Sequence, residues 1–518
     1  MATPAYWPTE GWRTSAPEEQ GIDSAKLANA LLTIRAKNIQ VHSLLLIRNG
    51  YAVVDAFFYP YDGTNVHDLA SVTKSVTTTL IGIAIDQGNL RLDQSMVSFF
   101  ADRSIANRDA RKERITVRHL VTMSSGLDCT REGDEATQKE MVASDDWVQF
   151  VLDRKVRWEP GTHFVYCSPG THLLSAILQQ ATGMTALEFA RQNLFEPLGI
   201  RDVVWPADPQ GVTRGWGDIR LHPRDAAKLG YLWLSKGRWE NTRMMSSNGL
   251  SKGVWEGKRF ASSRGLNKGI WGNRQIVSSS WVADSVKPQI QSDSDDYYGY
   301  GWWVSVAREK DELSSYRADG RGGQYVAVVP SLNIILATTG GGFELGQIDG
   351  LLLPALVDMS KPLPANPAGL SKLQAAIRTV AQPPARKPVA SLPSAARAIS
   401  GKTFVFKPNP QGIDTLRLDF NGSAEAVAYI RPSYSARTQR WPVGLDGVYR
   451  MSKGEYDHPQ GLRGYWASAQ TFVLEYDGIT SNDHVTLQMR FEGDQVVVKA
   501  QETAHELGAT FIGRLQTQ

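Results

Sequence analysis

A serine and a lysine lie three residues apart at the predicted start of a helix, in the run Ser71-Val72-Thr73-Lys74. Residues at this spacing share one helix face with Cβ atoms about 6 Å apart, so the Lys74 amine can reach the Ser71 hydroxyl. A partly desolvated lysine at the positive end of a helix can lose its proton near neutral pH. The unpaired Ser71 N–H can donate to an oxyanion. The motif therefore predicts a serine nucleophile activated by a lysine base.

A tyrosine after a proline-glycine turn is a candidate partner for this pair. Tyr166 lies between Pro160-Gly161 and another predicted helix, and Cys167 and Ser168 follow it. A phenol that faces a lysine ammonium can have its pKa lowered, and it can pass a proton from the serine to the leaving group. A half-buried core aromatic is the alternative interpretation of Tyr166.

A glycine-rich stretch, Gly320-Arg321-Gly322-Gly323, separates two predicted strands. Glycines let a substrate approach the backbone closely. A tight hairpin between the two strands would explain the same residues. The sequence leaves both interpretations open.

The elements that must position these residues predict a sheet with helices. Asp23 precedes an amphipathic helix over residues 24–38, and residues 41–58 read as two strands that turn at Asn49-Gly50. Strand patterns return in residues 299–306, 324–329 and 333–339. We therefore expect an α+β catalytic domain over residues 1–360, in which an antiparallel sheet flanked by helices carries an all-helical insertion at about 92–215.

Two further regions follow this domain. Seven prolines fall within residues 361–400 around one short helical patch, which predicts a linker. From 401 to 518 apolar and polar residues alternate with period two, and Glu492-Gly493-Asp494 marks a hairpin turn. We expect an antiparallel β-barrel or sandwich there, either as an independent unit or packed over the mouth of the active site.

A tandem repeat spans residues 236–283. Lys236, Lys252 and Lys268 each begin a Lys-Gly-x-Trp run, at a spacing of 16 residues. The repeat fits either an expanded surface loop or, through its three Trp side chains, a lid or a contact between subunits of a homo-oligomer.

Composition excludes several classes of partner. The 518 residues include 56 basic and 53 acidic ones, a net charge of +3, whereas phosphate-backbone binding needs a far more concentrated basic field. Nucleic acid is therefore not an expected partner. No stretch approaches the ~18 uninterrupted apolar residues of a membrane span. We expect a soluble protein, cytoplasmic or exported with its signal removed.

The sequence contains no metal-binding motif. The two cysteines, Cys129 and Cys167, lack zinc-finger spacing, and the nine histidines form no H-E-x-x-H or comparable cluster. A disulfide between the cysteines is left open, because it requires that the fold bring them close. Neither a metal nor another cofactor is expected.

The ordered motifs resemble a known superfamily. SVTK, then YCS, then the glycine-rich strand, together with ITVRHLVTMSSGL, WEPGTHFVYCSPG and YGYGWWV, resemble the serine β-lactamase and penicillin-binding-protein superfamily. The likeness is to the class C β-lactamase branch with its esterase and 6-aminohexanoate-dimer-hydrolase relatives, over residues from about 15 to 360. It implies that Ser71 is acylated, that Lys74 and Tyr166 transfer its proton, and that the Arg321 and Ser71 N–H groups form the oxyanion hole. The C-terminal region resembles the lipocalin-like modules appended to some members.

Two positions depart from the family pattern. The Lys or His of the third motif falls on Ala318, so the group that would bind a substrate carboxylate is absent there, and the Asn after the tyrosine is Ser168. Ser168, Gly320 and Gly322 are expected to contact the substrate.

We therefore expect a serine hydrolase that cleaves small carboxylic esters or amides through an acyl-enzyme. The alternatives left open are a β-lactamase, D-aminopeptidase or DD-peptidase activity, and a non-catalytic binding or regulatory protein.

Overall fold

The computed structural model of the chain describes residues 6–129, 133–240, 274–292, 295–307, 312–422, 424–454, 458–504 and 507–516. The repeat copies that begin at Lys252 and Lys268 start outside these ranges. In the first copy, β6 (Arg238–Trp239) pairs with β7 (Arg274–Gln275), and Trp239 is buried against Trp7. The expectations for the rest of the repeat concern residues that lie outside the described ranges.

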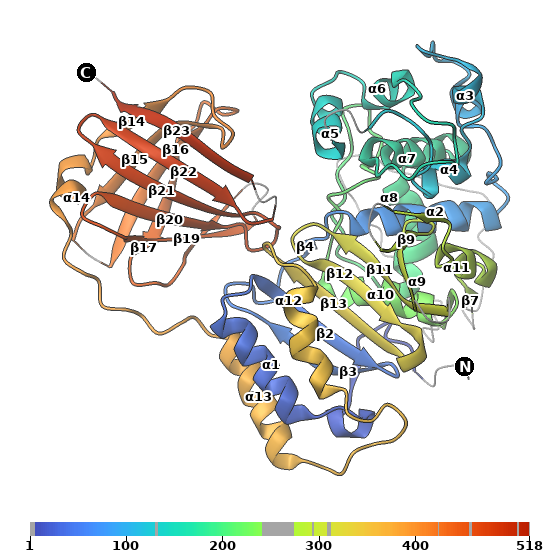
Figure 1. Cartoon of the computed structure of the whole chain (residues 1–518), viewed down its shortest axis with the longest axis horizontal. Coiled ribbons are helices and arrows are strands. Elements are labelled where there is room, and N and C mark those ends of the chain that lie inside the picture. Colours follow the sequence, from blue (N-terminus) through green and yellow to red (C-terminus); the bar gives the residue numbers. More distant parts are fainter. Residues whose placement is uncertain are drawn as a thin grey trace, which may run out of the picture.

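A nine-stranded sheet lies at the centre of the N-terminal region (Figure 1). Its order is β1-β3-β2-β13-β12-β11-β10-β9-β8, and all neighbours are antiparallel except β1 with β3. The strands are β1 (Arg13–Thr14), β2 (Val41–Arg48), β3 (Tyr51–Phe57), β8 (Ile290–Gln291), β9 (Tyr297–Tyr298), β10 (Trp303–Ala307), β11 (Glu312–Gly320), β12 (Gln324–Val329) and β13 (Ile334–Gly340). The expected β2–β3 turn is confirmed, with positive φ at Asn49 and Gly50. Because β2 also pairs with β13, strands far apart in the chain meet in the middle of the sheet.

Helices cover both faces of this sheet, and all eight residues of β2 are therefore buried. Leu45 and Ile47 join the apolar core that contains α2 (Val72–Asp86), α7 (Ser168–Thr182) and α10 (Pro223–Leu234). Leu44 and Leu46 join a second core under α1 (Ser24–Ala36), α12 (Gly346–Leu352) and α13 (Pro367–Ala381). The alternation of side chains along the strand thus supplies both cores.

The remaining helices lie mainly between α2 and α10, as the mixed α/β pattern predicts. They are α3 (Ala110–Glu113), α4 (Val117–Val121), α5 (Asp134–Val142), α6 (Trp147–Asp153), α8 (Ala186–Ala190) and α9 (Glu196–Leu198), with α11 (Ser279–Ser285) and α14 (Ser394–Ile399) later in the chain. A short ladder of β4 (His67–Asp68) with β5 (Arg220–Leu221) brings both ends of this stretch together. Across the described ranges, no helix has the length and apolar character needed to cross a membrane.

The structure corrects the linker expected over residues 361–400. Pro367 begins α13, at a position where the missing N–H of proline costs no hydrogen bond. α13 packs along α1, and Leu373 and Val380 are buried in the second core. The prolines therefore flank a helix of the N-terminal region, and irregular chain within 361–400 is found mainly over residues 361–366 and 382–393.

The C-terminal region is a closed barrel rather than a sandwich. Nine strands follow the order β17-β16-β15-β14-β23-β22-β21-β20-β19, and β19 returns to β17 through Gly444 opposite Arg463; β18 pairs outside this ring. The strands are β14 (Thr403–Phe406), β15 (Ile413–Phe420), β16 (Glu425–Pro432), β17 (Gln439–Gly444), β18 (Arg450–Lys453), β19 (Pro459–Trp466), β20 (Thr471–Asp477), β21 (His484–Glu492), β22 (Gln495–Glu502) and β23 (Leu507–Leu515). Inward residues such as Ala426, Ala428 and Ile430 alternate with more exposed ones and form a core of their own.

The barrel meets the N-terminal region at one end of its strands, close to β4 and β12 in Figure 1. The Asp68 N–H donates to the Thr480 carbonyl over 2.8 Å, and the Asn482 side chain donates to the Arg321 carbonyl over 3.2 Å. Tyr59 and Tyr449 make a further contact between the two regions. These contacts place one end of the barrel beside the candidate site, and Ser481, Asn482 and Asp483 of the barrel belong to the same cavity lining as Ser71.

Candidate active site

The start of α2 holds Ser71 and Lys74 as the sequence predicts. The Lys74 Nζ lies 2.8 Å from the Ser71 Oγ and donates to the Trp216 carbonyl over 2.9 Å. Ser71 is the N-cap residue of α2, but its side chain makes no capping hydrogen bond, so the Oγ stays available for chemistry. The preceding Ala70 has a φ of 45°, a strained left-handed conformation, and its N–H is held by the Asp68 carboxylate.

Burial gives Lys74 the properties of a base. Only 1% of the residue is exposed. Because low-dielectric surroundings disfavour the ammonium, its pKa falls to about 8, with Asp134 opposing part of this shift. Near neutral pH a sizeable minority of Lys74 is therefore unprotonated and able to accept the Ser71 proton.

Tyr166 reaches the same pair from the residues before α7. It lines the same cavity as Ser71, and its ring centroid lies 4.8 Å from the Lys74 Nζ. The expected lowering of its pKa is wrong, because burial raises the pKa of Tyr166 well above its usual value. Desolvation of the phenolate outweighs the nearby cation. Tyr166 therefore stays a neutral phenol, which can donate and accept a proton in a relay but is not a standing base.

The beginning of α7 is tied to the segment before α5. Cys129 and Cys167 form a disulfide, with Cα atoms 5.6 Å apart, so Cys167 is not a thiol. Ser168 donates through its hydroxyl to the Asp134 Oδ2 over 2.7 Å, and its backbone N–H donates to the other oxygen of the same carboxylate. The hydroxyl proton of Ser168 is thus engaged, and only an oxygen lone pair is left for a substrate.

The end of β11 approaches the start of α2 very closely. A Cβ on Gly320 would lie 2.5 Å from the Leu69 carbonyl and 3.2 Å from the Ser71 N, so only glycine fits there. Arg321 follows at the cavity wall. Gly322, with a φ of +84°, instead packs against Asn482 of the barrel. The β11–β12 hairpin thus accounts for Gly322, and the structure gives no support to its expected contact with substrate.

Side chains of β11 alternate between the core and the cavity. Ala318 is 1% exposed and belongs to the core, whereas Arg317 and Asp319 line the cavity. The Arg317 guanidinium lies 3.0 Å from Asp319 and 2.8 Å from Asp296. The position of the family's Lys or His is therefore occupied by a buried alanine. The neighbouring cation, Arg317, is already paired with two carboxylates.

These residues surround a cavity of about 660 Å³. Ser71, Tyr166, Ser168 and Arg321 line it, and Lys74 lies beneath Ser71. Its wall carries six carboxylates against three guanidinium groups, namely Asp68, Asp134, Glu135, Asp218, Asp319 and Asp483 against Arg220, Arg317 and Arg321. The lining residues thus carry three more formal negative charges than positive ones, and the Lys74 ammonium beneath them offsets one of these where it is protonated. Within the described ranges, no three His, Cys, Asp or Glu side chains are arranged to hold a metal ion.

Sequence reasoning missed three participants of this site. The Trp216 carbonyl, the Asp134 carboxylate and the Asn482 amide carry no motif, and each lies 34 or more residues from its partner in the chain. A local spacing rule finds pairs on one helix face, whereas contacts of this kind depend on how distant segments pack.

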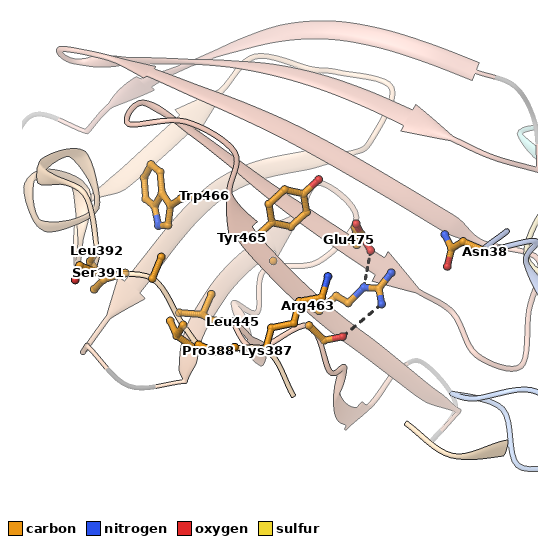
Figure 2. A pocket seen from close by; sticks show the side chains of 14 residues that line it. Asn38, Lys387, Pro388, Ser391, Leu392, Leu445, Arg463, Tyr465, Trp466 and Glu475 are labelled. Carbon is orange, nitrogen blue, oxygen red and sulfur yellow. Dashed lines mark hydrogen bonds and ion pairs between the residues drawn. The ribbon is translucent and has the colours of Figure 1, made fainter. Parts of the chain in front are cut away.

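A second hollow of about 550 Å³ lies between residues 387–392 and the outer face of the barrel (Figure 2). Tyr465 and Trp466 line it, and the Arg463 guanidinium pairs with Glu475 over 2.6 Å. Its lining holds a serine, Ser391, and a lysine, Lys387, four residues apart on an irregular segment. The arrangement found at Ser71 is not repeated there, because no helix aligns the two side chains.

Comparison with known proteins agrees with this geometry. The sequence model of the Beta-lactamase family matches residues 28–343. The match covers more than half of the 518 residues, and the chain belongs to this family.

Two curated relatives and one solved structure illustrate the likeness. The chain is 27% identical to Lovastatin esterase from Penicillium rubens over 245 residues, which cover 43% of this chain and 60% of that protein. It is 22% identical to 6-aminohexanoate-dimer hydrolase from Paenarthrobacter ureafaciens over 254 residues, covering 45% and 62%. The chain thus spans about 60% of the length of these two relatives. An octameric penicillin-binding protein homologue from Pyrococcus abyssi aligns over 94% of this chain and 99% of its own, at 17% identity and a TM-score of 0.46.

Proposed function

We propose that this protein is a serine hydrolase that cleaves carboxylic esters or amides through a covalent acyl-enzyme. The observation that carries the proposal is the Lys74 amine 2.8 Å from the Ser71 Oγ, at the wall of a cavity that Tyr166 also lines. A nucleophile and a base with a pKa of about 8 are thereby in direct contact, and a phenol that can relay a proton lies beside the base. Family membership supports the same chemistry.

Each half-reaction follows from these contacts. The Ser71 Oγ attacks the acyl carbonyl while its proton passes to neutral Lys74, and the tetrahedral intermediate collapses as the bond to the leaving group breaks. The leaving alkoxide or amine takes a proton from Tyr166, which is replenished from Lys74. Water then attacks the acyl-enzyme by the same route in reverse and releases the carboxylic acid and free Ser71.

The negative charge of the tetrahedral intermediate needs two donors. The Ser71 N–H lies at the start of α2 beside Gly320, and the Arg321 N–H lies in the turn that follows β11. Donors fixed in place before the reaction stabilise the oxyanion at no cost of reorganisation. We assign the oxyanion hole to these two groups.

The charge of the cavity favours neutral or cationic substrates. Six carboxylates face three guanidinium groups, and Arg317 is already paired with Asp319 and Asp296. An anionic substrate therefore meets net repulsion in a partly dehydrated cavity. Neutral esters and amides are the preferred substrate class, ahead of carboxylate-bearing β-lactams.

Labelling with a fluorophosphonate probe tests the proposal. The probe phosphonylates an activated serine, so the intact mass of the wild type should rise by one adduct and Ser71→Ala should stay unlabelled. Peptide mapping should place the adduct on Ser71. Failure of the folded wild type to take up the probe or to hydrolyse 4-nitrophenyl acetate would overturn the assignment and favour a non-catalytic binding protein.

A further inference from the structure

One loop of the barrel touches both walls of the cavity. Residues 478–483 connect β20 to β21, and Ser481, Asn482 and Asp483 line the cavity. The Thr480 carbonyl accepts the Asp68 N–H, three residues before the nucleophile. The same loop therefore contacts the segment that carries Ser71 and the turn that carries Arg321.

Asn482 makes the contact to the Arg321 turn. It is 5% exposed, and its side-chain amide donates to the Arg321 carbonyl over 3.2 Å. A Cβ on Gly322 would lie 2.7 Å from the Asn482 Cβ, so the two segments are in direct contact. The amide of Asn482 thus has a fixed position beside the turn.

A second amide holds the same carbonyl from within the sheet. The Gln324 side chain donates to the Arg321 carbonyl over 3.2 Å and also bonds to the backbone of Gly340. Gly322 and Gly323 both have positive φ, and glycines restrain a turn very little on their own. The Gly342 N–H also donates to the Gly322 carbonyl over 3.0 Å and Thr338 donates to the Gly323 carbonyl, but the Arg321 carbonyl itself is held by the two side-chain amides, one of them supplied by the barrel.

The geometry points to Asn482 as a positioning residue for the oxyanion hole, so that the barrel completes the active site of the catalytic region. By holding the Arg321 carbonyl, Asn482 fixes the turn whose Arg321 N–H must face the same point as the Ser71 N–H. This inference rests on the proposed hydrolase function. It extends that function by making a residue of the barrel necessary for transition-state binding.

Removal of the amide should act on the transition state rather than on substrate binding. The loss of one oxyanion donor, or its displacement by about 1 Å, lowers the rate on the order of a hundredfold. Because Gln324 remains, we expect Asn482→Ala to lower kcat on a 4-nitrophenyl ester about 10- to 100-fold, with KM changed less than about threefold. The rate is expressed per active site, counted by fluorophosphonate titration.

A boronic acid separates positioning from a general structural role. It forms a tetrahedral adduct with the serine and places an oxygen in the oxyanion hole, as the transition state does. The inhibition constant of phenylboronic acid should rise in Asn482→Ala by about the same factor as kcat falls. A loss of kcat without weaker boronate inhibition would show a structural effect only and would overturn the inference.

Two further variants complete the test, one as a substitute for the alanine variant and one as a control. Asn482→Leu preserves the approximate size of the side chain but removes the donor, and it serves if the alanine variant fails to fold; it should show the same losses. Ser468→Ala removes a hydroxyl that accepts from Gln470 and Thr471 at the opposite end of β20, and it should leave kcat within twofold. A folded Asn482 variant with kcat reduced less than fivefold, in an active and labelled wild type, refutes this inference alone. An inactive, unlabelled wild type refutes the proposed function instead.

Discussion

The two hollows of this molecule have similar volumes but very different chemistry. The cavity at Ser71 measures about 660 Å³ and the hollow beside residues 387–392 about 550 Å³, and each is lined by charged and aromatic side chains. In the first, a helix fixes the serine and lysine, and Lys74 is buried enough to lose its proton near pH 8. In the second, Ser391 and Lys387 lie on an irregular, largely exposed segment. Volume and residue types therefore do not define a serine hydrolase site; shared geometry and desolvation do.

The largest effect should come from the nucleophile. Ser71→Ala removes the covalent route, so kcat on a 4-nitrophenyl ester should fall by about a thousandfold or more. The fold should survive the loss of one hydroxyl, and circular dichroism checks this. Ser391→Ala, at the second hollow, is the matched control and should keep wild-type activity. If Ser71→Ala keeps more than a tenth of the wild-type kcat, the nucleophile lies at another site.

Loss of the proton-transfer groups should have the next largest effect. Lys74→Ala and Tyr166→Phe should each lower kcat about a hundredfold or more, because each removes one step of the relay. Lys387→Ala provides the control at the second hollow. Rates measured on folded protein, normalised by fluorophosphonate titration where labelling persists, check the result. A Tyr166→Phe enzyme with full activity would reduce Tyr166 to a core aromatic.

The acidic wall of the cavity should discriminate against anionic substrates. A charge-assisted hydrogen bond to a carboxylate is worth about 1.5–3 kcal/mol, so its absence at Ala318 should disfavour such substrates about 10- to 150-fold. We expect kcat/KM to be higher for 4-nitrophenyl butyrate than for the 4-nitrophenyl monoester of succinic acid or a chromogenic cephalosporin. Added salt should narrow the difference in kcat/KM between the two esters, because it screens the charge of the succinate ester. The two esters share a leaving group, so their rates can be compared directly. Faster cephalosporin turnover would reveal a carboxylate partner among the arginines of the wall.

The pH dependence should report the buried lysine. Lys74 must be neutral to accept the serine proton, and its pKa is lowered to about 8. The neutral fraction therefore rises about tenfold between pH 7 and pH 9, and kcat/KM for a neutral ester should rise with it and level off above pH 9. Asp134 raises the pKa of Lys74, so Asp134→Asn should move the midpoint to lower pH. A rate that falls over this range would contradict the assignment of Lys74 as base.

The smallest effect should come from the second hollow. Tyr465 is 51% exposed, and Tyr465→Ala leaves the barrel core intact. We expect kcat/KM and the thermal midpoint to stay close to wild type, with the rate changed less than about twofold, because surface substitutions away from a site cost little. A tenfold loss of activity would show that the hollow takes part in substrate binding after all.

Much of the fold could be predicted because its signals are local. Asp23 caps α1 through the Ala25 and Lys26 N–H groups, and Asn49-Gly50 makes the tight β2–β3 turn. The alternation after residue 401 marked the strands of the C-terminal region. The closure of those strands into a barrel could not be predicted, because it depends on β17 meeting β19. The placement of α13 on α1 was also missed, since prolines at its borders resembled a linker.

The sequence by itself determined the Ser71–Lys74 pair, because a spacing of three residues on one helix places both side chains on the same face. Only the tertiary structure decided what surrounds that pair. It brought the Tyr166 ring to the Lys74 amine, the Trp216 carbonyl to the same amine and Asn482 of the barrel to the Arg321 turn. Burial also raised the pKa of Tyr166 where a neighbouring cation alone would lower it. Desolvation and contacts between distant segments depend on the packing of the whole chain, and no local pattern encodes them.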